Sequence, residues 1–434
     1  MMEYKIREER EGCFLFERET GTAIKLDEET YQKIKEIIRK GEKKEMDNLK
    51  EQLKGINVDK LKNEIANIKI IEKNREQLPK DALSAPARVY FEITRKCTLR
   101  CKTCFNESEI QLKKEMTNEE LEKVIDQLDE LGTFEIRFTG GEPTTRPDFL
   151  DIIQYAKEKG FYISLGTNGI YSEEKLRKIA ESGVDWFIVS LDGDEKTNNY
   201  IRGEGTYKIT LETLKYLSDR KKRIRLNCVV GKYNLALIPF LANLCDNFKI
   251  ESLNLIPLRP YGRFSVFLSD QMLTRYEFYS MIRKINELKS SHKVKFITTI
   301  NLLEKGNLQK QDRIVRKERA CAAGIEATVI SPDGYVYGCS YSPASNIESE
   351  DKEGKSIFIA GNLFQTPIKE IWYDSSRWDV FRDLKKYKNE KCHGCKHYGN
   401  ECVGSCPIMA FYETRKLDTL DPYCFVNIIK QENE

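Results

Sequence analysis

The sequence is poor in histidine, with only His292, His393 and His397 among 434 residues. The sequence therefore offers few residues for histidine-rich metal sites or for catalytic triads with a histidine base. Neither sign of charge dominates either, because 72 Lys and Arg residues face 69 Asp and Glu residues. This near balance excludes a globally basic nucleic-acid-binding protein, and we expect no nucleic-acid partner.

Long apolar runs are also missing. No segment approaches the roughly 20 apolar residues that span a bilayer, and the start, Met1-Met2-Glu3-Tyr4-Lys5, has no apolar signal core. We therefore expect no membrane association and no export, and we expect the protein to be cytoplasmic. In that reducing compartment, the 13 cysteines indicate metal or redox chemistry rather than disulfides.

The patterning divides the chain into predicted domains at residues 1–80, 81–300 and 301–434. In the first domain, short alternating runs separated by Gly12 and Gly21 predict a three-stranded antiparallel sheet. Apolar residues at helical spacing follow, and they predict one helix and then thin amphipathic helices as far as Ile68. A small sheet followed by helices predicts a winged-helix-like module. The predicted strands are 4–9, 13–18 and 22–26, and the first helix covers 31–38.

The second domain alternates strand and helix signals six times. One predicted helix begins at Thr117, which forms a capping box with Glu120. Six βα units predict an α/β fold with a parallel sheet, closed in part as a (βα)6 TIM-like barrel. In such folds, the chemistry gathers at the C-terminal ends of the strands. The predicted strands are 89–93, 134–138, 162–165, 186–191, 224–230 and 252–258, and the predicted helices are 117–131, 149–159, 173–182, 207–217, 237–248 and 276–288.

Three cysteines, Cys97, Cys101 and Cys104, stand on the loop after the first barrel strand. Three thiolates within eight residues can converge on one inorganic cluster. A structural zinc site would need a fourth Cys or His nearby, but the next cysteine along the chain is Cys228. Three cysteines instead suit a four-iron cluster with one open iron.

This C-x3-C-x2-C loop on a six-unit barrel resembles the radical S-adenosylmethionine (SAM) superfamily. The resemblance implies that the open iron binds SAM and that an electron from the cluster splits SAM into a 5′-deoxyadenosyl radical, which abstracts hydrogen from carbon. It also implies that the protein positions the cofactor and excludes water.

Later strand ends carry further motifs that resemble this family. Gly140-Gly141-Glu142-Pro143 matches its GGEP motif, which holds the SAM ammonium, and Thr167-Asn168 lies in a TNG-like turn. The resemblance further implies a set of SAM contacts near the ribose, the carboxylate and the adenine. Ser190 and Asp192 would lie near the ribose, and Arg202 would contact the carboxylate. The residues that would border the adenine are Asn227, Val229 and Ile256.

The third domain is short in regular structure and dense in cysteine, so we expect bound metal to stabilise it. Zinc ribbons are one interpretation, and His393 and His397 could complete such sites. The spacing, together with the text from Ile330 to Cys339 and the pair Ile371-Trp372, resembles the SPASM extension of radical SAM enzymes, although the gap from Cys395 to Cys402 is one residue longer than usual. The resemblance implies two auxiliary clusters, and thus three [4Fe-4S] clusters in all. By analogy Cys392, Cys395, Cys402 and Cys424 hold the outer cluster, and Cys321, Cys339 and Cys406 hold the inner one.

The inner set is one thiolate short of the four that a fully cysteine-bound cluster needs. A non-cysteine ligand, a distant Cys228 or Cys245, or a thiolate of the substrate could fill the position. Otherwise Cys13, Cys228 and Cys245 are most simply small core residues.

Residues 1–80 resemble the precursor-peptide recognition element of peptide-maturing radical enzymes, on the text from Arg7 to Gly12 and from Phe14 to Leu26. The resemblance implies that a leader peptide adds a strand to the open sheet edge, although a generic module that only packs on the barrel is an alternative. The predicted enzyme forms a thioether cross-link in a ribosomally made precursor peptide and takes electrons from a flavodoxin- or ferredoxin-type reductant. The alternatives are C–C cross-linking, oxidative decarboxylation or sulfatase formylglycine formation, and, outside enzymes, an iron–sulfur electron-transfer or zinc-stabilised binding protein.

Overall fold

The computed structural model describes residues 3–260, 262–298, 321–342, 357–383, 386–387, 389–395 and 406–424. Its first unit is a small α/β module. Strands β1 (Tyr4–Glu8), β2 (Cys13–Glu17) and β3 (Thr22–Leu26) are antiparallel, as predicted. The prediction of only three strands was wrong, because β4 (Lys69–Ile71) pairs in parallel with β1 and gives the order β3-β2-β1-β4. Three residues after a Lys- and Glu-rich helical stretch are too few to show a period of two.

Helices cover one face of this sheet. Helix α1 begins at the cap residue Asp27, whose side chain accepts a hydrogen bond from the Thr30 amide, and ends at Gly41 with φ +70°. Leu15 and Ile34 are both 0% exposed and lie in the core between sheet and helices. The helical elements are α1 (Glu28–Lys40) and α2 (Val58–Asn63), with 3-10 turns at Lys43–Leu49, Ile65–Asn67 and Arg75–Gln77.

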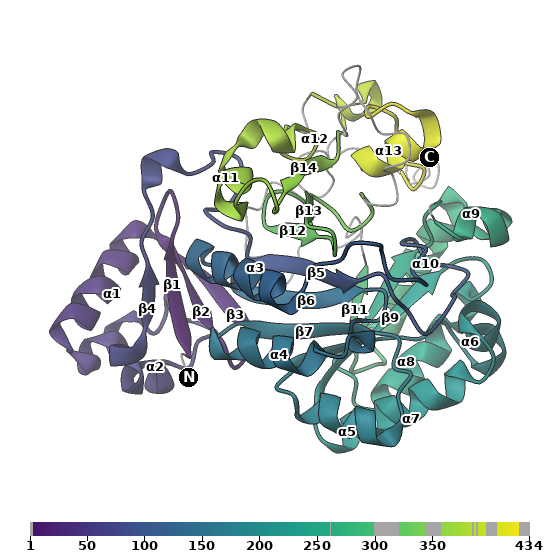
Figure 1. The fold of residues 1–434 in the computed structure, drawn as a ribbon, viewed down its shortest axis with the longest axis horizontal. Helices are drawn as coiled ribbons and strands as arrows, with labels where there is room; N and C mark the ends of the chain where they lie inside the picture. The colour runs from purple at the N-terminus through teal and green to yellow at the C-terminus, as the bar shows by residue number, and fades with distance from the viewer. Residues whose placement is uncertain are drawn as a thin grey trace.

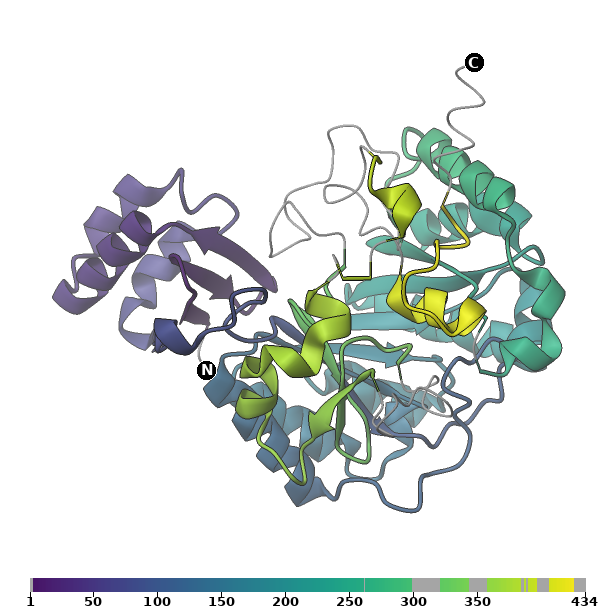
Figure 2. The same ribbon diagram turned by 90° about the horizontal axis from the view of Figure 1, so that it is seen from above.

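The opposite face of the sheet lies against the N-terminal ends of the barrel strands (Figures 1 and 2). Phe16 stacks on Phe134 with 4.7 Å between ring centroids. Arg7 is fully buried, donates to the Gly132 carbonyl (2.9 Å) and lies 4.5 Å from the Phe134 ring. Lys5 pairs with Asp129 at 2.9 Å. The module is therefore packed onto the barrel through buried side chains.

The barrel contains the six predicted parallel strands, each followed by helix. A further short strand, β11 (Lys295–Thr298), pairs in parallel with β10, and β12 pairs in parallel with β5 at the other edge. The six strands are β5 (Arg88–Thr94), β6 (Glu135–Gly140), β7 (Tyr162–Thr167), β8 (Trp186–Ser190), β9 (Arg223–Val230) and β10 (Ser252–Pro257). The helices are α3 (Asn118–Leu131), α4 (Phe149–Glu158), α5 (Glu173–Glu181), α6 (Glu195–Arg202), α7 (Thr206–Asp219), α8 (Ile238–Asn247), α9 (Phe264–Phe267) and α10 (Arg275–Leu288), with 3-10 turns at Pro143–Thr145, Leu235–Leu237 and Ser269–Gln271.

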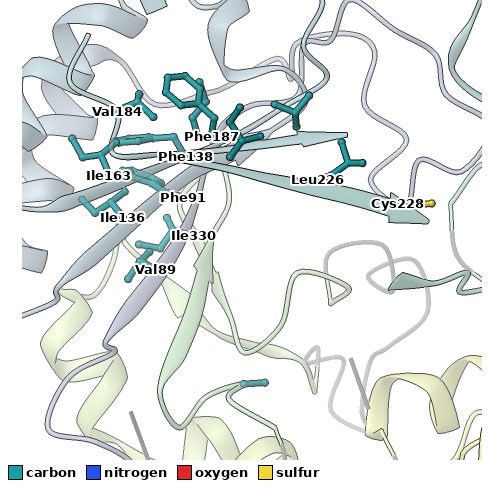
Figure 3. Close-up of a cluster of buried hydrophobic side chains, with 14 of the residues drawn as sticks. Val89, Phe91, Ile136, Phe138, Ile163, Val184, Phe187, Leu226, Cys228 and Ile330 are labelled. Carbon is teal, nitrogen blue, oxygen red and sulfur yellow. The ribbon is translucent and has the colours of Figure 1, made fainter. Parts of the chain in front are cut away.

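Alternation along the strands separates two environments. Val89, Phe91, Ile136 and Phe138 point to the helix side and form the main core, which Figure 3 shows. The residues between them, such as Arg88 and Tyr90, therefore face the inside of the barrel.

The C-terminal region continues the barrel sheet rather than standing apart from it (Figure 1). Buried side chains also stabilise this region. Trp372 and Trp378 are 0% exposed, and the Trp372 indole donates a hydrogen bond to the Leu83 carbonyl at 2.8 Å. None of the helices in the described ranges is long and apolar enough to cross a membrane. The elements are β12 (Ala327–Ile330), β13 (Tyr335–Tyr337), β14 (Ile359–Asn362), α11 (Ile368–Tyr373), α12 (Asp379–Arg382) and α13 (Pro407–Thr414), with 3-10 turns at Ser375–Trp378 and Glu390–Cys392.

Candidate active site and cluster cysteines

The first cysteine loop follows β5 at the C-terminal end of the barrel, where it was predicted. Cys97, Cys101 and Cys104 are free thiols of intermediate exposure. Backbone hydrogen bonds shape the loop, from the Cys97 amide to the Glu109 carbonyl (3.2 Å) and from the Cys104 amide to the Cys101 carbonyl (3.2 Å). Soft thiols grouped on one short loop are the donor set that an iron–sulfur cluster takes.

Arg263, which follows the sixth barrel strand, forms hydrogen bonds to this loop. The sequence analysis did not identify it. Its guanidinium donates to the carbonyls of Cys101 (2.9 Å) and Ser108 (3.0 Å), and its amide donates to the Cys104 carbonyl (3.1 Å). The neighbouring Gly262 has φ +64°, and a Cβ there would lie 2.3 Å from the Cys104 carbonyl oxygen. The pair Gly262-Arg263 after the sixth strand was the sequence feature that could have indicated this contact. However, no spacing rule relates the pair to the cysteines.

The glycine pair at the end of β6, Gly140 and Gly141, lets the following turn pack against the cysteine loop. A Cβ on Gly140 would lie 2.3 Å from the Thr94 carbonyl oxygen, and one on Gly141 would lie 2.2 Å from that of Lys96. The Gly141 amide donates to the Thr94 carbonyl at 2.7 Å. Only glycine therefore fits at these two positions.

The next residue, Glu142, is only 1% exposed. Its carboxylate accepts hydrogen bonds from the Asn168 amide (2.8 Å) and from the hydroxyls of Thr144 (2.8 Å) and Thr167 (3.0 Å). Tyr171, which the sequence analysis missed, also donates to it at 3.5 Å. Burial raises the pKa of Glu142, while these donors act in the opposite direction. The turns after β6 and β7 thus meet at one buried carboxyl group.

Asn168 connects this group to the first cysteine. Its side-chain amide donates to the Thr98 hydroxyl (3.0 Å) and lies 3.9 Å from the Cys97 sulfur. The structure therefore brings the predicted Thr167-Asn168 turn to the cysteine loop.

The residues after β8 approach the loop from the other side. Asp192 is 0% exposed and pairs with Arg202 at 2.8 Å, and Arg202 also lies 3.9 Å from the Cys101 sulfur. Burial raises the pKa of Cys101 to about 11, although Arg202 opposes this effect. Asn234, a further residue that the sequence analysis missed, donates to the Asp192 carbonyl at 2.8 Å. The predicted Asp192 and Arg202 therefore meet at the second cysteine.

The remaining predicted SAM contacts lie on neighbouring strand ends. Ser190 stands opposite Asn227 in the register of β8 and β9, and Val229 stands opposite Ile256 in that of β9 and β10. The Val229 amide donates to the Asp192 carboxylate at 2.9 Å. All these positions thus share the edge of the barrel that carries the cysteine loop.

The inner cysteine set also comes together. Cys339 has intermediate exposure, and burial raises the pKa of its thiol, with the nearby Cys406 and Cys321 adding to the effect. Arg259 opposes the rise at Cys339 and also acts on Cys406. Mutual electrostatic influence of this kind places the three sulfurs in one neighbourhood.

The inner set lies beside the first cysteine loop. Phe105, which follows Cys104, meets Tyr341 edge to face with 5.1 Å between ring centroids, and Tyr341 stands two residues after Cys339. This contact joins the loop between β5 and α3 to the segment after β13.

The outer set is described only in part, because Cys402 and His397 lie outside the described residues. Asn389 donates to the Asp418 carbonyl at 2.8 Å, which ties the segment before Cys392 and Cys395 to the segment before Cys424. No group of three or more His, Cys, Asp or Glu side chains in the described part of the chain is arranged to hold a single metal ion. A four-iron cluster instead takes its thiolates on separate iron atoms, which alternate with sulfide at the corners of a cube, so its ligands stand further apart than those of one ion.

The three unclustered cysteines are core residues, as predicted. Cys13, Cys228 and Cys245 are 0%, 1% and 0% exposed. Cys228 lies on β9 in the main core (Figure 3). Both Cys228 and Cys245 are thus packed among apolar side chains.

Comparisons with known proteins agree with these motifs. A family model described as the radical SAM superfamily matches residues 91–240, and one described as an iron–sulfur cluster-binding domain, SPASM, matches residues 321–396. Mycofactocin maturase MftC of Mycobacterium tuberculosis is 26% identical, covering 79% of this chain and 83% of that protein. An AdoMet-dependent heme synthase of Nitratidesulfovibrio vulgaris is also 26% identical, covering 77% and 91%.

Among solved structures, Streptococcus suis SuiB bound to S-adenosylmethionine superposes with a TM-score of 0.70 at 17% identity. The match covers 97% of this chain and 98% of that chain. SuiB has also been solved bound to the precursor peptide SuiA, and that structure matches with a TM-score of 0.69. The fold is therefore shared over nearly the whole chain.

Proposed function

Because the chain is a radical SAM enzyme with a SPASM domain, we propose that it modifies a ribosomally made precursor peptide. The match to SuiB carries this proposal, because coverage of 97% of this chain includes most of the N-terminal module. SuiB has been solved bound to a precursor peptide. We divide the chain accordingly into a recognition module at 1–80, a radical SAM barrel at 81–300 and a SPASM domain at 301–434.

The leader peptide is proposed to bind along β3. The sheet order leaves β3 and β4 as the two edges of the module's sheet. The β4 edge faces the barrel, where Lys69 pairs with Asp129 (2.9 Å) and Lys73 donates to the Leu131 carbonyl (2.8 Å). In the described part of the chain, no strand pairs with the outer side of β3, which supports strand addition there.

Two isoleucines give a matched test of this docking edge. Ile24 on β3 and Ile70 on β4 are both partly buried against the same module core. We expect Ile24→Asp to weaken binding of a fluorescent leader peptide about tenfold or more, and Ile70→Asp to leave it within about twofold, because only the first alters the binding edge. Equal losses in the two variants would refute docking on β3.

The site residues are assigned by the geometry of the barrel edge. Cys97, Cys101 and Cys104 would hold the SAM cluster, and Glu142 would bind the ammonium of SAM. Arg202, oriented by the buried Asp192, would bind the carboxylate of SAM. With SAM bound, the cluster would supply the electron that splits SAM, and the resulting 5′-deoxyadenosyl radical would take hydrogen from substrate carbon.

Around that chemistry, this chain's own residues orient the cofactor and keep water away. Arg263 holds the cysteine loop through two backbone carbonyls. Glu142 receives four protein donors and is buried, so it is preorganised to accept a cationic group.

The bond formed is proposed to be a thioether between a substrate cysteine and a substrate carbon. The inner set has three cysteines, and Cys228 and Cys245 are buried in the barrel core, so a substrate thiolate is the proposed fourth ligand. The carbon–hydrogen bond breaks and its hydrogen leaves in 5′-deoxyadenosine. The thiol proton would pass to solvent when the sulfur binds as a thiolate. The carbon–sulfur bond would then form with release of one electron, which the clusters would accept.

The test uses anaerobically reconstituted enzyme with SAM, a chemical reductant and short cysteine-containing peptides encoded beside the gene. Mass spectrometry should show loss of two hydrogen atoms and a carbon–sulfur link in the fragment spectra. The same peptide with Ser in place of Cys should not cross-link. Loss of carbon dioxide, a carbon–carbon link or an aldehyde would instead indicate decarboxylation, C–C cross-linking or formylglycine formation.

The same preparation tests the cofactor assignment. We propose three [4Fe-4S] clusters, so iron should approach 12 atoms per chain. Stoichiometric zinc with little iron would refute the assignment. We further propose that the enzyme works in the reducing cytoplasm with a flavodoxin- or ferredoxin-type reductant, and the twelve described cysteines, all of them free thiols, support the compartment.

A further inference from the structure

The inside of the barrel carries an unusual set of charges near the start of the strands. Arg88 stands opposite Glu135, and Tyr90 stands opposite Arg137, in the register of β5 and β6. Since their neighbours on the same strands face the helix-side core, these side chains face inward. Arg225 of β9 joins them from across the barrel.

The cluster contains three guanidinium groups but only one carboxylate, Glu135, among the residues that the structure describes. Glu135 accepts from Arg137 (2.9 Å) and from the Ser164 hydroxyl (2.7 Å), and it also pairs with Arg88. Burial alone would raise the pKa of Glu135, but Arg88 and Arg137 lower it to about 2. The single carboxylate is therefore fully ionised and already engaged by two arginines.

Arg225 has no ion pair with any residue that the structure describes. Its Nε donates to the Ser252 hydroxyl (3.3 Å), and its guanidinium lies 4.0 Å from the centre of the Trp186 ring. Burial, followed by Arg137 and Arg88, lowers the pKa of Arg225 to about 9. Arg225 has intermediate exposure, and a partly desolvated cation beside other cations is costly unless an anion accompanies it.

Arg137 also has an unused donor. The residue is 8% exposed, and its buried Nε has no hydrogen-bond partner, while its other nitrogens reach Glu135 and, at 3.4 Å, the Tyr90 hydroxyl. An unpartnered buried donor next to an uncompensated cation marks a place where a negatively charged acceptor is missing.

We propose that Arg137 and Arg225 bind a carboxylate of the peptide substrate inside the barrel. This inference rests on the proposed function and names a recognition element for it. Planar guanidinium groups pair with carboxylates through parallel hydrogen bonds, and the Arg225 guanidinium already lies over the Trp186 ring. Arg137 and Glu142 are five positions apart along strand and turn, so their Cα atoms lie at most roughly 18 Å from each other. Binding there sets how far the substrate enters the barrel.

Sodium acetate is the first probe, titrated calorimetrically into the reconstituted full-length enzyme at constant ionic strength. We expect one acetate per chain, and we expect Arg225→Gln and Arg137→Gln each to weaken binding about tenfold or more, as expected for loss of a charge-assisted hydrogen bond. The matched control is Arg220→Gln, because Arg220 stacks on Tyr216 (3.4 Å) but is exposed. It should leave acetate binding unchanged.

Protein stability provides a second measurement that does not depend on acetate affinity. Removing the charge of Arg225 relieves repulsion, so Arg225→Gln should melt at the same temperature as the wild-type protein or higher when no acetate is present. If Arg137→Gln does not fold, Arg225→Gln decides the outcome. Absence of acetate binding, equal binding by all variants, or chloride binding as tight as acetate would each overturn the proposal, the last because it indicates an adventitious ion only.

The peptide arm identifies the source of the carboxylate. A peptide that the enzyme modifies is compared with its C-terminal amide and with versions that carry Asn or Gln in place of Asp or Glu. We expect one of these changes to raise KM about tenfold or more in the wild-type enzyme and to have little further effect in Arg225→Gln. Unchanged KM for every version would overturn the proposal. If no peptide is modified at all, the proposed function fails, and the acetate titration still reports on the carboxylate site.

Discussion

Phe16→Ala is expected to loosen the N-terminal module from the barrel. Phe16 is 2% exposed and stacks on Phe134 at 4.7 Å with an interplanar angle of 10°. It belongs to the cluster of apolar side chains between the module and the barrel, not to the module's own core. The substitution should therefore reduce the free energy that joins the two units.

The expected loss follows from the burial of one aromatic ring. Truncation of a buried Phe to Ala typically costs about 3–5 kcal/mol, and the stacked geometry contributes about 0.5–1.5 kcal/mol of interaction. Arg7 remains bonded to the Gly132 carbonyl and can settle against Phe134, so part of the cavity can close. We therefore expect a loss of about 3–4 kcal/mol.

The assay is native-state hydrogen exchange at the amides of β1 and β2, which reports the free energy of local opening. Lys25→Ala is the matched control, because Lys25 is exposed and stands opposite Phe14 in the same sheet. The control should change the opening free energy by less than about 0.5 kcal/mol. A similarly small change in Phe16→Ala would refute the packed interface between Phe16 and Phe134.

The triple substitution of Cys97, Cys101 and Cys104 by Ala should abolish formation of 5′-deoxyadenosine and remove about a third of the bound iron; continued SAM cleavage would refute this cluster assignment. Glu142→Gln should raise KM for SAM about tenfold or more, because a neutral amide replaces a buried carboxylate; unchanged KM would exclude contact with the SAM ammonium. Burial and the nearby Arg7 lower the pKa of Lys73 to about 8, so the unfolded chain binds more protons than the folded one between about pH 8 and 10.4. Lys73→Met should therefore raise the melting temperature below pH 8, and its advantage should shrink as the pH rises through that window; a constant difference from pH 7 to 10.5 would contradict the cost of burying this charge.

Much of the fold can be predicted from local sequence patterns. Strand signals that alternate with helix signals predicted β5 to β10, and the capping box at Thr117 and Glu120 marks the start of α3. The cysteine spacings predicted the cluster loops because neighbouring ligands on a short loop are constrained by chain length alone. The short strands β4 and β11 escaped prediction, since three or four residues carry too little periodicity and acquire their structure from the strands beside them.

The candidate site was predicted residue by residue only where a motif fixed the spacing. Asp192 and Arg202 were both named beforehand, but only the folded chain makes them a buried pair beside Cys101. Arg263 was not named, because it reaches the Cys101 carbonyl across 162 positions of sequence. No local rule encodes such a contact.

The sequence by itself was enough to predict the cluster ligands, from ten clustered cysteines, and the SAM-binding turn, from a glycine pair before Glu142. It also predicted the six βα units of the barrel. Only the tertiary structure decided that Phe16 of the module packs on Phe134 of the barrel, and that Arg137 and Arg225 crowd together inside the barrel with a single carboxylate nearby. The physical reason is that periodicity and loop spacing are local properties of the chain. Burial, charge balance and pKa instead depend on which distant strands meet, and that is set when the sheet closes around its core.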